Sequence, residues 1–328
     1  MIVRVEKFHA DSFHELERRA KRIPWDEYVT KGSRVQFRVT CRKSRLYHSD
    51  AVAERLAESI IKRVGVIDVA NAGAKVTDEE EQHVAVDAPS QLFIVRLSHD
   101  ECTISADSSG SLLHRRGYRE ASGKAPLRET LAAAMVLSSG WDQRSPLVDP
   151  FCGSGTIAIE AALMARRIPP GLRRNFAFQQ WPGYQEAAWR QLKAEATKSS
   201  LPGLTGALMA SDRDDGVVRL AIENAARAGV LEDIQFRSKP ISAFEPSPEP
   251  GFVVTNPPYG VRVGERVGLR NLYAQLGNVL RKKARGYTVA VLSADKTLER
   301  MMAIPLTEVL RTRNGGIPVR LLEGRVEP

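Results

Sequence analysis

Cysteines and long apolar runs are both scarce in this sequence, and each scarcity excludes a class of protein. Three cysteines among 328 residues cannot supply a disulfide framework, which favours a reducing, cytoplasmic compartment. No apolar run reaches the ~18 residues of a membrane span, and the charged start of the chain does not resemble a secretory signal. The six histidines show no spacing typical of a zinc site. We therefore expect a globular protein that needs neither a membrane nor a metal.

Basic residues outnumber acidic ones by 48 to 39, which gives a formal net charge of +9. Such an excess favours a polyanionic partner without requiring one. Residues 1–120 hold 20 basic and 19 acidic residues, whereas the rest of the chain holds 28 and 20. Within the first part, residues 31–63 contain nine basic residues and three acidic ones. The excess of basic residues in the N-terminal part is thus confined to residues 31–63, whereas the remainder of the chain is basic overall.

The larger, C-terminal part of the chain has the pattern of an α/β domain. From about Gly123 onward, short apolar runs alternate with longer segments of helical periodicity, which predicts a doubly wound, mostly parallel sheet. Strands are expected at 146–150, 207–210, 252–255 and 287–292, and helices at 131–137, 156–166, 217–228 and 269–283. The glycine turn Asn314-Gly315-Gly316 lies between two apolar runs and predicts an antiparallel hairpin at the edge of the sheet.

The first ~115 residues have shorter elements, which predict a small α+β module. Strands are expected at 34–40, 84–86 and 92–97, and a helix at 50–64. Residues 108–124 are rich in serine, glycine and arginine, and their composition predicts a linker. We therefore expect an N-terminal module over 1–107, this linker, and an α/β domain over 125–328.

A glycine-rich turn follows the strand expected at 146–150 and has the sequence Asp-Pro-Phe-Cys-Gly-Ser-Gly-Thr over 149–156. It lacks the lysine of a Walker loop and the third glycine of a dinucleotide fingerprint, so neither phosphate-binding pattern fits. Asp149 suits an amine-bearing ligand, and Asp212, at the end of the next strand, can accept both hydroxyls of a ribose. Together these features indicate S-adenosylmethionine (SAM), the alternative being two solvated strand ends. Cys152 is expected to be a packing residue of the turn.

The strand expected at 252–255 ends in Asn256-Pro257-Pro258-Tyr259. Prolines fix φ and lack N–H donors, so the amide oxygen of Asn256 and the carbonyl of Pro257 can each accept one hydrogen of an exocyclic amine. Tyr259 is placed to stack on a flat nucleobase, which must leave its own stack to enter such a pocket. The alternative is an ordinary proline-rich turn with a tyrosine in the core.

Residues 149–155 and 256–259 resemble motifs I and IV of the class I SAM-dependent amino-methyltransferases. Residues 113–119 and 124–134, together with Phe176-Ala177-Phe178, Trp181-Pro182 and Asn314-Gly315, are similar to the THUMP-domain RNA methyltransferases, in particular the bacterial 23S rRNA guanine-N2 branch. The resemblance implies a Rossmann-like domain with a seven-stranded mixed sheet over 125–328. It also implies a THUMP-type RNA-binding domain over 1–107, with the ferredoxin-like segment that usually precedes THUMP partly absent.

The resemblance also implies roles for individual residues. The catalytic residues would be Asn256, Pro257 and Tyr259. The SAM-binding residues would be Thr130, Asp149, Phe151, Gly153, Gly155, Thr156 and Asp212. The RNA-binding residues would be Arg42, Lys43, Arg45, Arg115, Arg116 and Arg262, although a solvated helix entrance also explains the first three. Residues 236–241 lack the aspartate that binds adenine in many amino-methyltransferases, so adenine is assigned no residue.

The implied function is methylation of guanine N2 in 23S rRNA by a monomeric enzyme. The alternatives are a tRNA guanine-N2 methyltransferase, an adenine-N6 methyltransferase acting on DNA or RNA, and a protein glutamine methyltransferase. A further alternative is an rRNA-binding assembly factor without activity. Phe176, Phe178 and Trp181 fit either the wall of a base pocket or a local core.

Overall fold

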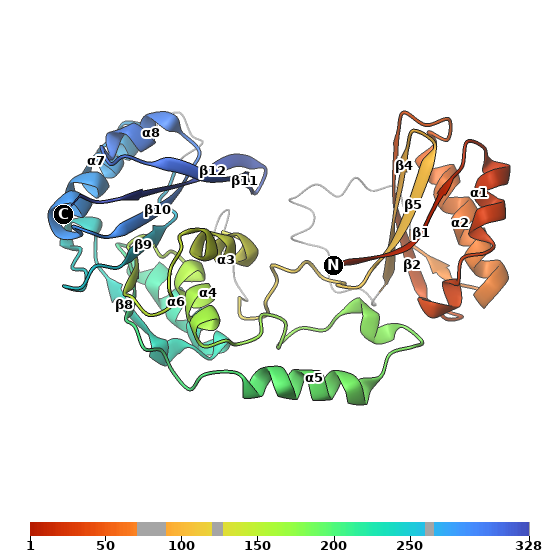
Figure 1. The fold of residues 1–328 in the computed structure, drawn as a ribbon, viewed down its shortest axis with the longest axis horizontal. Helices are drawn as coiled ribbons and strands as arrows, with labels where there is room; N and C mark the ends of the chain where they lie inside the picture. The colour runs from red at the N-terminus through yellow and green to blue at the C-terminus, as the bar shows by residue number, and fades with distance from the viewer. Residues whose placement is uncertain (71–89, 120–126, 260–265, 328) are drawn as a thin grey trace. The chain divides into compact units, whose positions relative to one another are not determined.

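The computed structural model describes residues 1–70, 90–119, 127–259 and 266–327, which belong to two compact units. Unit 1 contains residues 1–113 and 174–192, and unit 2 contains residues 114–173 and 193–328. The chain therefore leaves unit 2 after residue 173 and returns to it at residue 193 (Figure 1). Among the helices that the structure describes, none is both long and apolar enough to cross a membrane.

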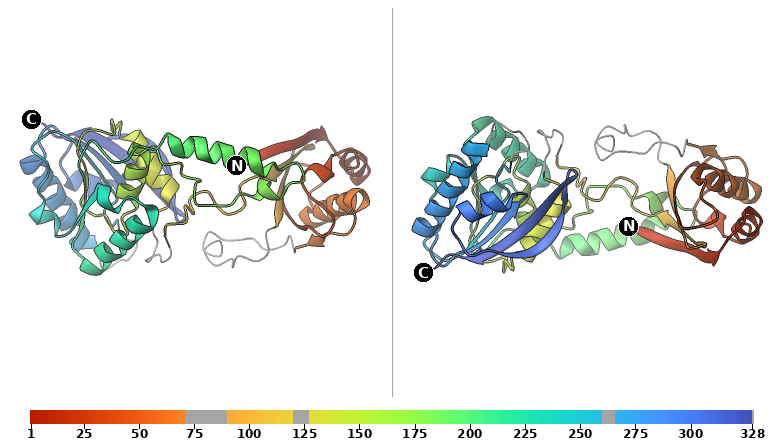
Figure 2. Two further views of the ribbon diagram at one scale, coloured as in Figure 1. Left: turned by 90° about the horizontal axis from the view of Figure 1, so that it is seen from below. Right: turned by 90° about the horizontal axis from the view of Figure 1, so that it is seen from above.

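Unit 1 is built on a five-stranded sheet in the order β1-β5-β4-β2-β3. Its strands are β1 (Ile2–His9), β2 (Arg34–Arg42), β3 (Asp68–Val69), β4 (Gln91–Ser98) and β5 (Glu101–Asp107). The helices α1 (Phe13–Ala20) and α2 (Ser49–Val64) lie together on one face of this sheet (Figure 1 and Figure 2). Val52, Leu56 and Ile60 recur at helical spacing along α2 and are fully buried, so α2 is held by its apolar stripe.

The α+β module predicted for the N-terminal part is confirmed. The strand and helix expected at 34–40 and 50–64 correspond to β2 and α2. The strand expected at 84–86 lies outside the described residues. The patterning did not reveal β1, which pairs antiparallel with β5 along its length. Six of its eight residues are exposed and only Phe8 is buried, so β1 lacks the alternation of buried apolar and exposed polar residues that marks a half-buried strand.

Unit 2 has a seven-stranded mixed sheet in the order β11-β12-β10-β9-β6-β7-β8. Its strands are β6 (Leu147–Asp149), β7 (Leu208–Asp212), β8 (Ile234–Ser238), β9 (Phe252–Thr255), β10 (Thr288–Ser293), β11 (Thr307–Asn314) and β12 (Ile317–Arg325). Strands β6 to β10 are parallel, and β12 pairs antiparallel with β10 and β11. The predicted α/β domain with an antiparallel edge hairpin is confirmed. Gly315 and Gly316 both have positive φ, as a tight hairpin turn requires.

Helices cover both faces of this sheet (Figure 1). One face packs against α3 (Glu129–Ser138), α4 (Thr156–Ala165) and α6 (Asp215–Ala228), and the other packs against α7 (Arg266–Lys283) and α8 (Lys296–Met301). Leu147 and Val148 are neighbours on β6 and belong to the two opposite cores. The central strands are therefore apolar on both sides, which explains their continuous apolar runs in the sequence.

The parallel order brings the candidate residues to one edge of the sheet. Strand β6 lies between β7 and β9, and all three point the same way. Their carboxyl ends carry Asp149, Asp212 and Thr255, with Asn256 immediately following. The strand order reverses between β6 and β9, and ligands of open α/β sheets bind at such a switch point.

The segment 174–192 of the α/β part groups with unit 1 rather than with unit 2. Trp181 donates a 2.7 Å hydrogen bond from Nε1 to Oε1 of Gln91 on β4, and its ring contacts Tyr28 edge to face at 5.0 Å. Phe176 and Phe178 stack on each other at 5.5 Å. These aromatic residues therefore form a local core in unit 1, ahead of and along α5 (Glu186–Lys198).

Residues 108–119, the described part of the expected linker, are packed rather than loose. Tyr118 is 2% exposed and belongs to the core of unit 2, and residues 114–119 group with that unit. Composition favoured a linker over 108–124 because serine, glycine and arginine are common there, but a single buried tyrosine is enough to anchor the segment. Unit 2 therefore begins before the expected start at residue 125.

Candidate active site

The turn between β6 and α4 depends on its glycines. Gly153 and Gly155 have φ of 50° and 82°, a left-handed conformation that costs other residues energy. A Cβ on Gly155 would lie 3.0 Å from Cβ of Ala221 on α6, whereas a Cβ on Gly153 would meet nothing within 4 Å. Gly155 is thus required for packing, and Gly153 leaves its surroundings open to a ligand.

Hydrogen bonds from neighbouring elements fix the shape of this turn. Asn224, which is fully buried on α6, donates from Nδ2 to the carbonyl of Ser154 at 3.0 Å. The backbone N–H of Gly153 donates to Oδ2 of Asp212 at 3.2 Å. Asn224 was not predicted as a site residue, although a polar residue within the small apolar stripe of α6 is a detectable signal. Cys152 packs in the core as predicted, and burial raises the pKa of its thiol.

Asp149 is a nearly fully buried carboxyl group at the end of β6. Its Oδ1 accepts hydrogen bonds from the hydroxyl of Thr255 at 2.6 Å and from the backbone N–H of Phe151 at 3.2 Å. Its Oδ2 has no hydrogen-bond partner within the described part of the chain. Burial raises the pKa of Asp149 to about 7, the two hydrogen bonds oppose this rise, and the charge of Asp212 adds to it. An amine donor placed at Oδ2 would satisfy this group and favour its charged form.

Asp212 lies at the end of the adjacent strand and is half-buried. Its Oδ1 accepts from the backbone N–H of Asp214 at 3.1 Å, and its Oδ2 accepts from Gly153. Each carboxylate oxygen has further lone pairs, so Asp212 can hold the glycine turn and still accept two hydroxyl groups. This arrangement suits a ribose beside the turn.

The other predicted cofactor residues occupy mixed environments. Thr130 is exposed on the first turn of α3, whereas its neighbour Glu129 is buried. The hydroxyl of Thr156 accepts a hydrogen bond from Nη2 of Arg119, which also donates to the carbonyl of Leu127 at 3.1 Å. Thr156 is the first residue of α4, and its hydroxyl is thus already hydrogen-bonded to Arg119.

The loop after β9 presents the predicted catalytic residues. Oδ1 of Asn256 is buried and has no hydrogen-bond partner among the residues that the structure describes. Pro257 is buried, and Tyr259 is half-buried between the two cores of unit 2. The hydroxyl of Tyr259 accepts a 2.9 Å hydrogen bond from Nδ2 of Asn314, at the tip of the edge hairpin. Burial raises the pKa of Tyr259, which keeps its phenol neutral.

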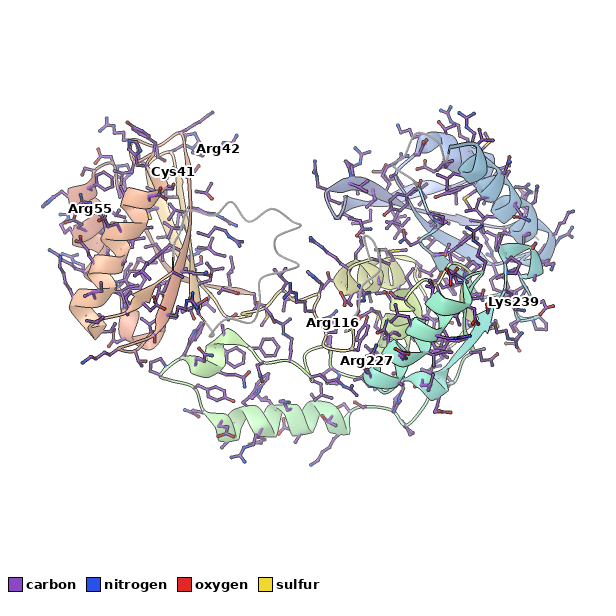
Figure 3. All side chains as sticks on the ribbon, turned by 180° about the vertical axis from the view of Figure 1, so that it is seen from behind. Cys41, Arg42, Arg55, Arg116, Arg227 and Lys239 are labelled. Carbon is purple, nitrogen blue, oxygen red and sulfur yellow. The ribbon has the colours of Figure 1, made fainter. Side chains whose placement is uncertain are left out.

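The predicted RNA-binding residues lie in different places. Arg42 is the last residue of β2 in unit 1, as Figure 3 shows, and Lys43 and Arg45 follow it. All three residues are exposed. Arg45 forms a 2.8 Å ion pair with Asp11. Arg262 lies outside the described residues.

Arg116, also predicted to bind RNA, is instead part of the interior of unit 2. Its Nη2 lies 3.3 Å from Oε2 of Glu160 on α4, and its side chain is 14% exposed. The hydroxyl of Tyr118 donates to the other oxygen of Glu160 at 3.1 Å. Burial raises the pKa of Glu160 to about 7 and the guanidinium of Arg116 opposes this rise, so Arg116 supports a buried carboxyl group, and its RNA binding stays a prediction. Its neighbour Arg115 is half-buried.

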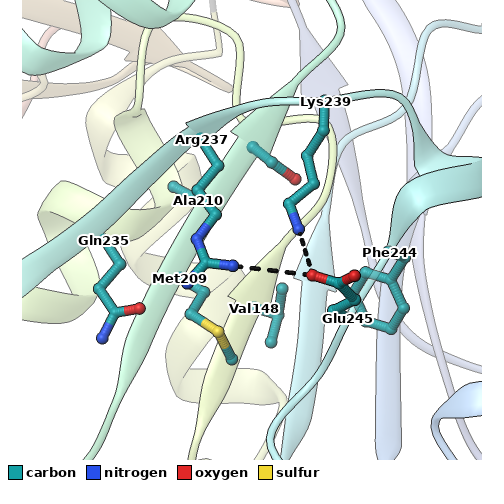
Figure 4. A pocket seen from close by; sticks show the side chains of 9 residues that line it. Val148, Met209, Ala210, Gln235, Arg237, Lys239, Phe244 and Glu245 are labelled. Carbon is teal, nitrogen blue, oxygen red and sulfur yellow. Dashed lines mark hydrogen bonds and ion pairs between the residues drawn. The ribbon is translucent and has the colours of Figure 1, made fainter.

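A pocket also opens on the face of β6, β7 and β8 that is turned toward the α7 side (Figure 4). Val148, Met209 and Phe244 give it an apolar lining. Its charged groups pair with one another, since Lys239 lies 2.8 Å and Arg237 lies 3.8 Å from Oε2 of Glu245. Both cations of this pocket thus share the one carboxylate of Glu245, whereas buried acceptors that lack a partner within the described residues lie at the glycine turn and the Asn-Pro-Pro-Tyr loop, which remain the candidate site.

The architecture of unit 2 defines a class of enzyme. A mixed seven-stranded sheet with an antiparallel edge pair, and a glycine turn after strand β6, make up the class I methyltransferase fold. The family model described as "RMKL-like, methyltransferase domain" matches residues 116–322, and the THUMP domain model matches residues 10–107. The chain belongs to the RMKL-like methyltransferase family, with a THUMP domain before the catalytic domain. The predicted resemblance is thereby confirmed.

Known proteins with similar sequences carry RNA methyltransferase names. A protein of Synechocystis sp. named as a candidate RNA methyltransferase is 33% identical over 320 residues, which cover 97% of this chain and 80% of that protein. The ribosomal RNA large subunit methyltransferase K/L of Legionella pneumophila is 40% identical over 238 residues, or 71% of this chain. That match spans only 34% of the Legionella protein.

Solved structures with the same arrangement cover the whole chain. SMU.472, described as a candidate methyltransferase complexed with SAH, has a TM-score of 0.83 and 26% identity over all of this chain and 84% of its own. A protein from Listeria monocytogenes, described as a predicted N6-adenine-specific DNA methylase, has a TM-score of 0.81 and 30% identity over all of this chain and 82% of its own.

Proposed function

We propose that this chain transfers the methyl group of SAM to the N2 amine of a guanine in 23S rRNA. The observation that carries the proposal is the buried amide oxygen of Asn256, which has no partner among the described residues and follows directly after β9. A buried polar atom without a partner is costly unless a ligand completes it. An exocyclic amine offers the matching donor.

The loop favours reaction at nitrogen by holding the amine hydrogens. Asn256 can accept one hydrogen through Oδ1, and the Pro257 carbonyl can accept the other, because neither proline of the loop has an N–H to compete. Holding both hydrogens shifts the nitrogen toward sp³ geometry, which withdraws its lone pair from conjugation with the ring and makes it available for attack. The nitrogen then forms the new N–C bond as the C–S bond breaks, and one amine proton passes to water. Positioning and fixed dipoles suffice, and no covalent intermediate with the chain is needed.

The residues around the glycine turn fit SAM. When bound, SAM supplies a methyl group activated by its positive sulfur. The unpartnered Oδ2 of Asp149 suits a donor such as an amine, and the two oxygens of Asp212 suit ribose hydroxyls. Gly153 adds no side chain to the space beside them. These fits support the assignment of Asp149, Gly153 and Asp212 to the cofactor, with Phe151, Gly155 and Thr156 shaping the turn and Thr130 at the methionine end.

Three observations favour RNA as the substrate. The THUMP match covers the N-terminal domain, the K/L relative is named for large-subunit ribosomal RNA, and Arg42, Lys43 and Arg45 form an exposed basic loop. Phosphate contacts from such a loop give affinity without base specificity. We propose that this loop binds rRNA, and that tRNA is the second candidate. The description of the Listeria protein makes adenine N6 the main rival chemistry.

Product analysis tests the proposal directly. The purified chain would be incubated with labelled SAM and, separately, with 23S rRNA, 16S rRNA and tRNA from a strain that lacks the gene, and with duplex DNA. Digestion to nucleosides followed by mass spectrometry identifies the methylated base. We expect N2-methylguanosine in 23S rRNA only. N6-methyladenine as the product, or N2-methylguanosine in tRNA alone, would contradict the proposal.

A further inference from the structure

The edge hairpin carries a side chain that meets the catalytic loop. Asn314 is the last residue of β11 and directly precedes the turn at Gly315 and Gly316. Asn314 is 5% exposed, and its Nδ2 donates to the hydroxyl of Tyr259 at 2.9 Å. A residue from the far edge of the sheet thus contacts the loop that follows its middle strand β9.

The carboxamide of Asn314 is only half satisfied. Its Oδ1 is buried and has no hydrogen-bond partner in the described part of the chain. Oδ1 of Asn256, three residues before Tyr259, is likewise buried and without a hydrogen-bond partner in the described part of the chain. The loop therefore contributes one buried acceptor through Asn256, and the hairpin contributes another through Asn314, whose Nδ2 is bonded to the hydroxyl of Tyr259. Such acceptors are rarely left without a donor in a folded protein.

We propose that Asn314 is a specificity-determining residue whose Oδ1 accepts the N1–H of the target guanine. This inference rests on the proposed function, and it names how the same site distinguishes its base. Guanine presents two adjacent donors on its Watson–Crick edge, N1–H and the N2 amine. Asn256 takes a hydrogen of the amine, and Asn314 takes the ring hydrogen beside it.

The pairing of acceptors discriminates against adenine. Adenine has an amine on this edge, but its neighbouring ring nitrogen N1 is an acceptor. An adenine amine placed on Asn256 would bring N1 toward Oδ1 of Asn314, and two acceptors would face each other without a hydrogen. A site whose acceptors require a hydrogen-bond donor on the ligand rejects a ligand without that donor, and this rejection is much stronger than the one an apolar pocket can give. The hydrogen bond to Tyr259 holds the carboxamide in the orientation that presents Oδ1.

A base analogue tests this role separately from catalysis. Two 23S rRNA fragments would carry either guanine or 2-aminopurine at the methylated position found by mass spectrometry. Both bases have the 2-amino group, but N1 of 2-aminopurine has no hydrogen. For the wild-type chain we expect kcat/KM to be about 10- to 100-fold higher with guanine. For Asn314→Ala we expect this preference to fall at least about tenfold, because guanine loses its acceptor while 2-aminopurine loses nothing comparable.

Matched variants separate recognition from folding. Asn314→Asp keeps an acceptor oxygen and should retain a guanine preference, whereas Asn278→Ala, at an exposed asparagine of α7, should change neither substrate. An equal loss of activity on both RNAs in Asn314→Ala would overturn the inference, since it indicates a purely structural role. A wild-type product of N6-methyladenine would instead overturn the proposed function. An unchanged guanine preference in Asn314→Ala would leave the proposed function standing and refute the role of Asn314.

Discussion

The hydroxyl of Thr255 donates a 2.6 Å hydrogen bond to the carboxylate of Asp149 and joins the two halves of the candidate site. Thr255 ends the strand before the Asn-Pro-Pro-Tyr loop, and Asp149 ends the strand before the glycine turn. Both residues are buried, so the bond is shielded from water. This side-chain bond therefore adds to the parallel pairing of β6 and β9 in holding the glycine turn beside the Asn-Pro-Pro-Tyr loop.

Removing this hydroxyl should weaken both stability and cofactor binding. Thr255→Val keeps the size of the side chain but leaves Oδ1 of Asp149 with only the Phe151 N–H. We expect the free energy of unfolding to fall by about 1–3 kcal/mol, the cost of a lost buried hydrogen bond. Urea unfolding at pH 7 measures this change. Thr255→Ser retains the hydroxyl and should lose less than half as much; equal losses in the two variants would assign the effect to packing instead.

Cofactor affinity should depend on pH through Asp149. Burial raises the pKa of this carboxyl to about 7 in the free protein, and an amine donor at Oδ2 would lower it. Binding therefore releases a proton below pH 7, so affinity is weak in acid and rises as the pH increases. For a group with this pKa, the dissociation constant for S-adenosylhomocysteine should fall about tenfold between pH 6 and pH 8. Isothermal titration calorimetry in buffers of different ionisation enthalpy measures both the affinity and the proton release.

The Asp149→Asn variant is the control for this dependence. It cannot titrate at this position, so its weaker binding should vary little over the same pH range. Asn256→Ala leaves Asp149 in place and should show the wild-type dependence. A wild-type affinity that does not change between pH 6 and pH 8 would mean that Asp149 makes no contact with the cofactor amine.

The two glycines of the turn should respond differently to alanine. Both have positive φ, so each substitution carries a similar backbone penalty, but only the methyl group of Gly155→Ala meets Ala221 at 3.0 Å. We expect Gly155→Ala to lose about 1 kcal/mol more stability than Gly153→Ala. Gly153→Ala should mainly weaken SAM binding, because its methyl group enters the open space beside Asp212. Parallel urea titrations and calorimetry of the two variants check this; equal stability losses would show that α6 moves to accommodate the methyl group.

The sequence was enough to predict that the candidate site residues lie at the carboxyl ends of buried strands. An apolar run that stops at a polar or glycine-rich turn marks the end of a buried strand, and parallel order then places consecutive ends at one edge. Asp149, Asp212 and Asn256 meet for this reason. The strand at 252–255 was predicted at its observed bounds.

The contacts that complete the site could not be predicted in the same way. Thr255 and Asp149 are 106 residues apart, Asn224 and Ser154 are 70 apart, and Asn314 and Tyr259 are 55 apart. Each contact depends on how two elements pack against each other. The pattern of apolar and polar residues within one element does not determine which side chains of another element it will contact. The same limit applies to the ion pair between Arg116 and Glu160, which are 44 residues apart.

Asn256 should be essential for transfer and dispensable for cofactor binding. Its Oδ1 is buried and makes no hydrogen bond to the described residues of the glycine turn, and we propose that it accepts from the substrate amine. We expect Asn256→Ala to lower kcat by at least about 100-fold, the loss seen when one acceptor or donor of a preorganised site is removed. The affinity for S-adenosylhomocysteine should stay within about twofold of the wild type. Single-turnover methylation of 23S rRNA and calorimetry test the two parts, and wild-type turnover in this variant would remove Asn256 from the mechanism.

The exposed loop after β2 should contribute to RNA affinity through charge alone. Replacing Arg42, Lys43 and Arg45 by glutamine removes three positive charges, and each phosphate contact contributes about 0.7–0.9 to the slope of log affinity against log salt. We therefore expect weaker binding to a 23S rRNA transcript and a slope that is smaller by about 2. The matched control replaces Lys21, Arg22 and Lys62, three exposed basic residues of the same unit, and loses the same charge elsewhere. Filter-binding titrations between 50 and 300 mM salt, roughly the range over which phosphate contacts are resolved, compare the two triple variants. Equal slopes in both would show that RNA responds to the net charge of unit 1 and not to this loop.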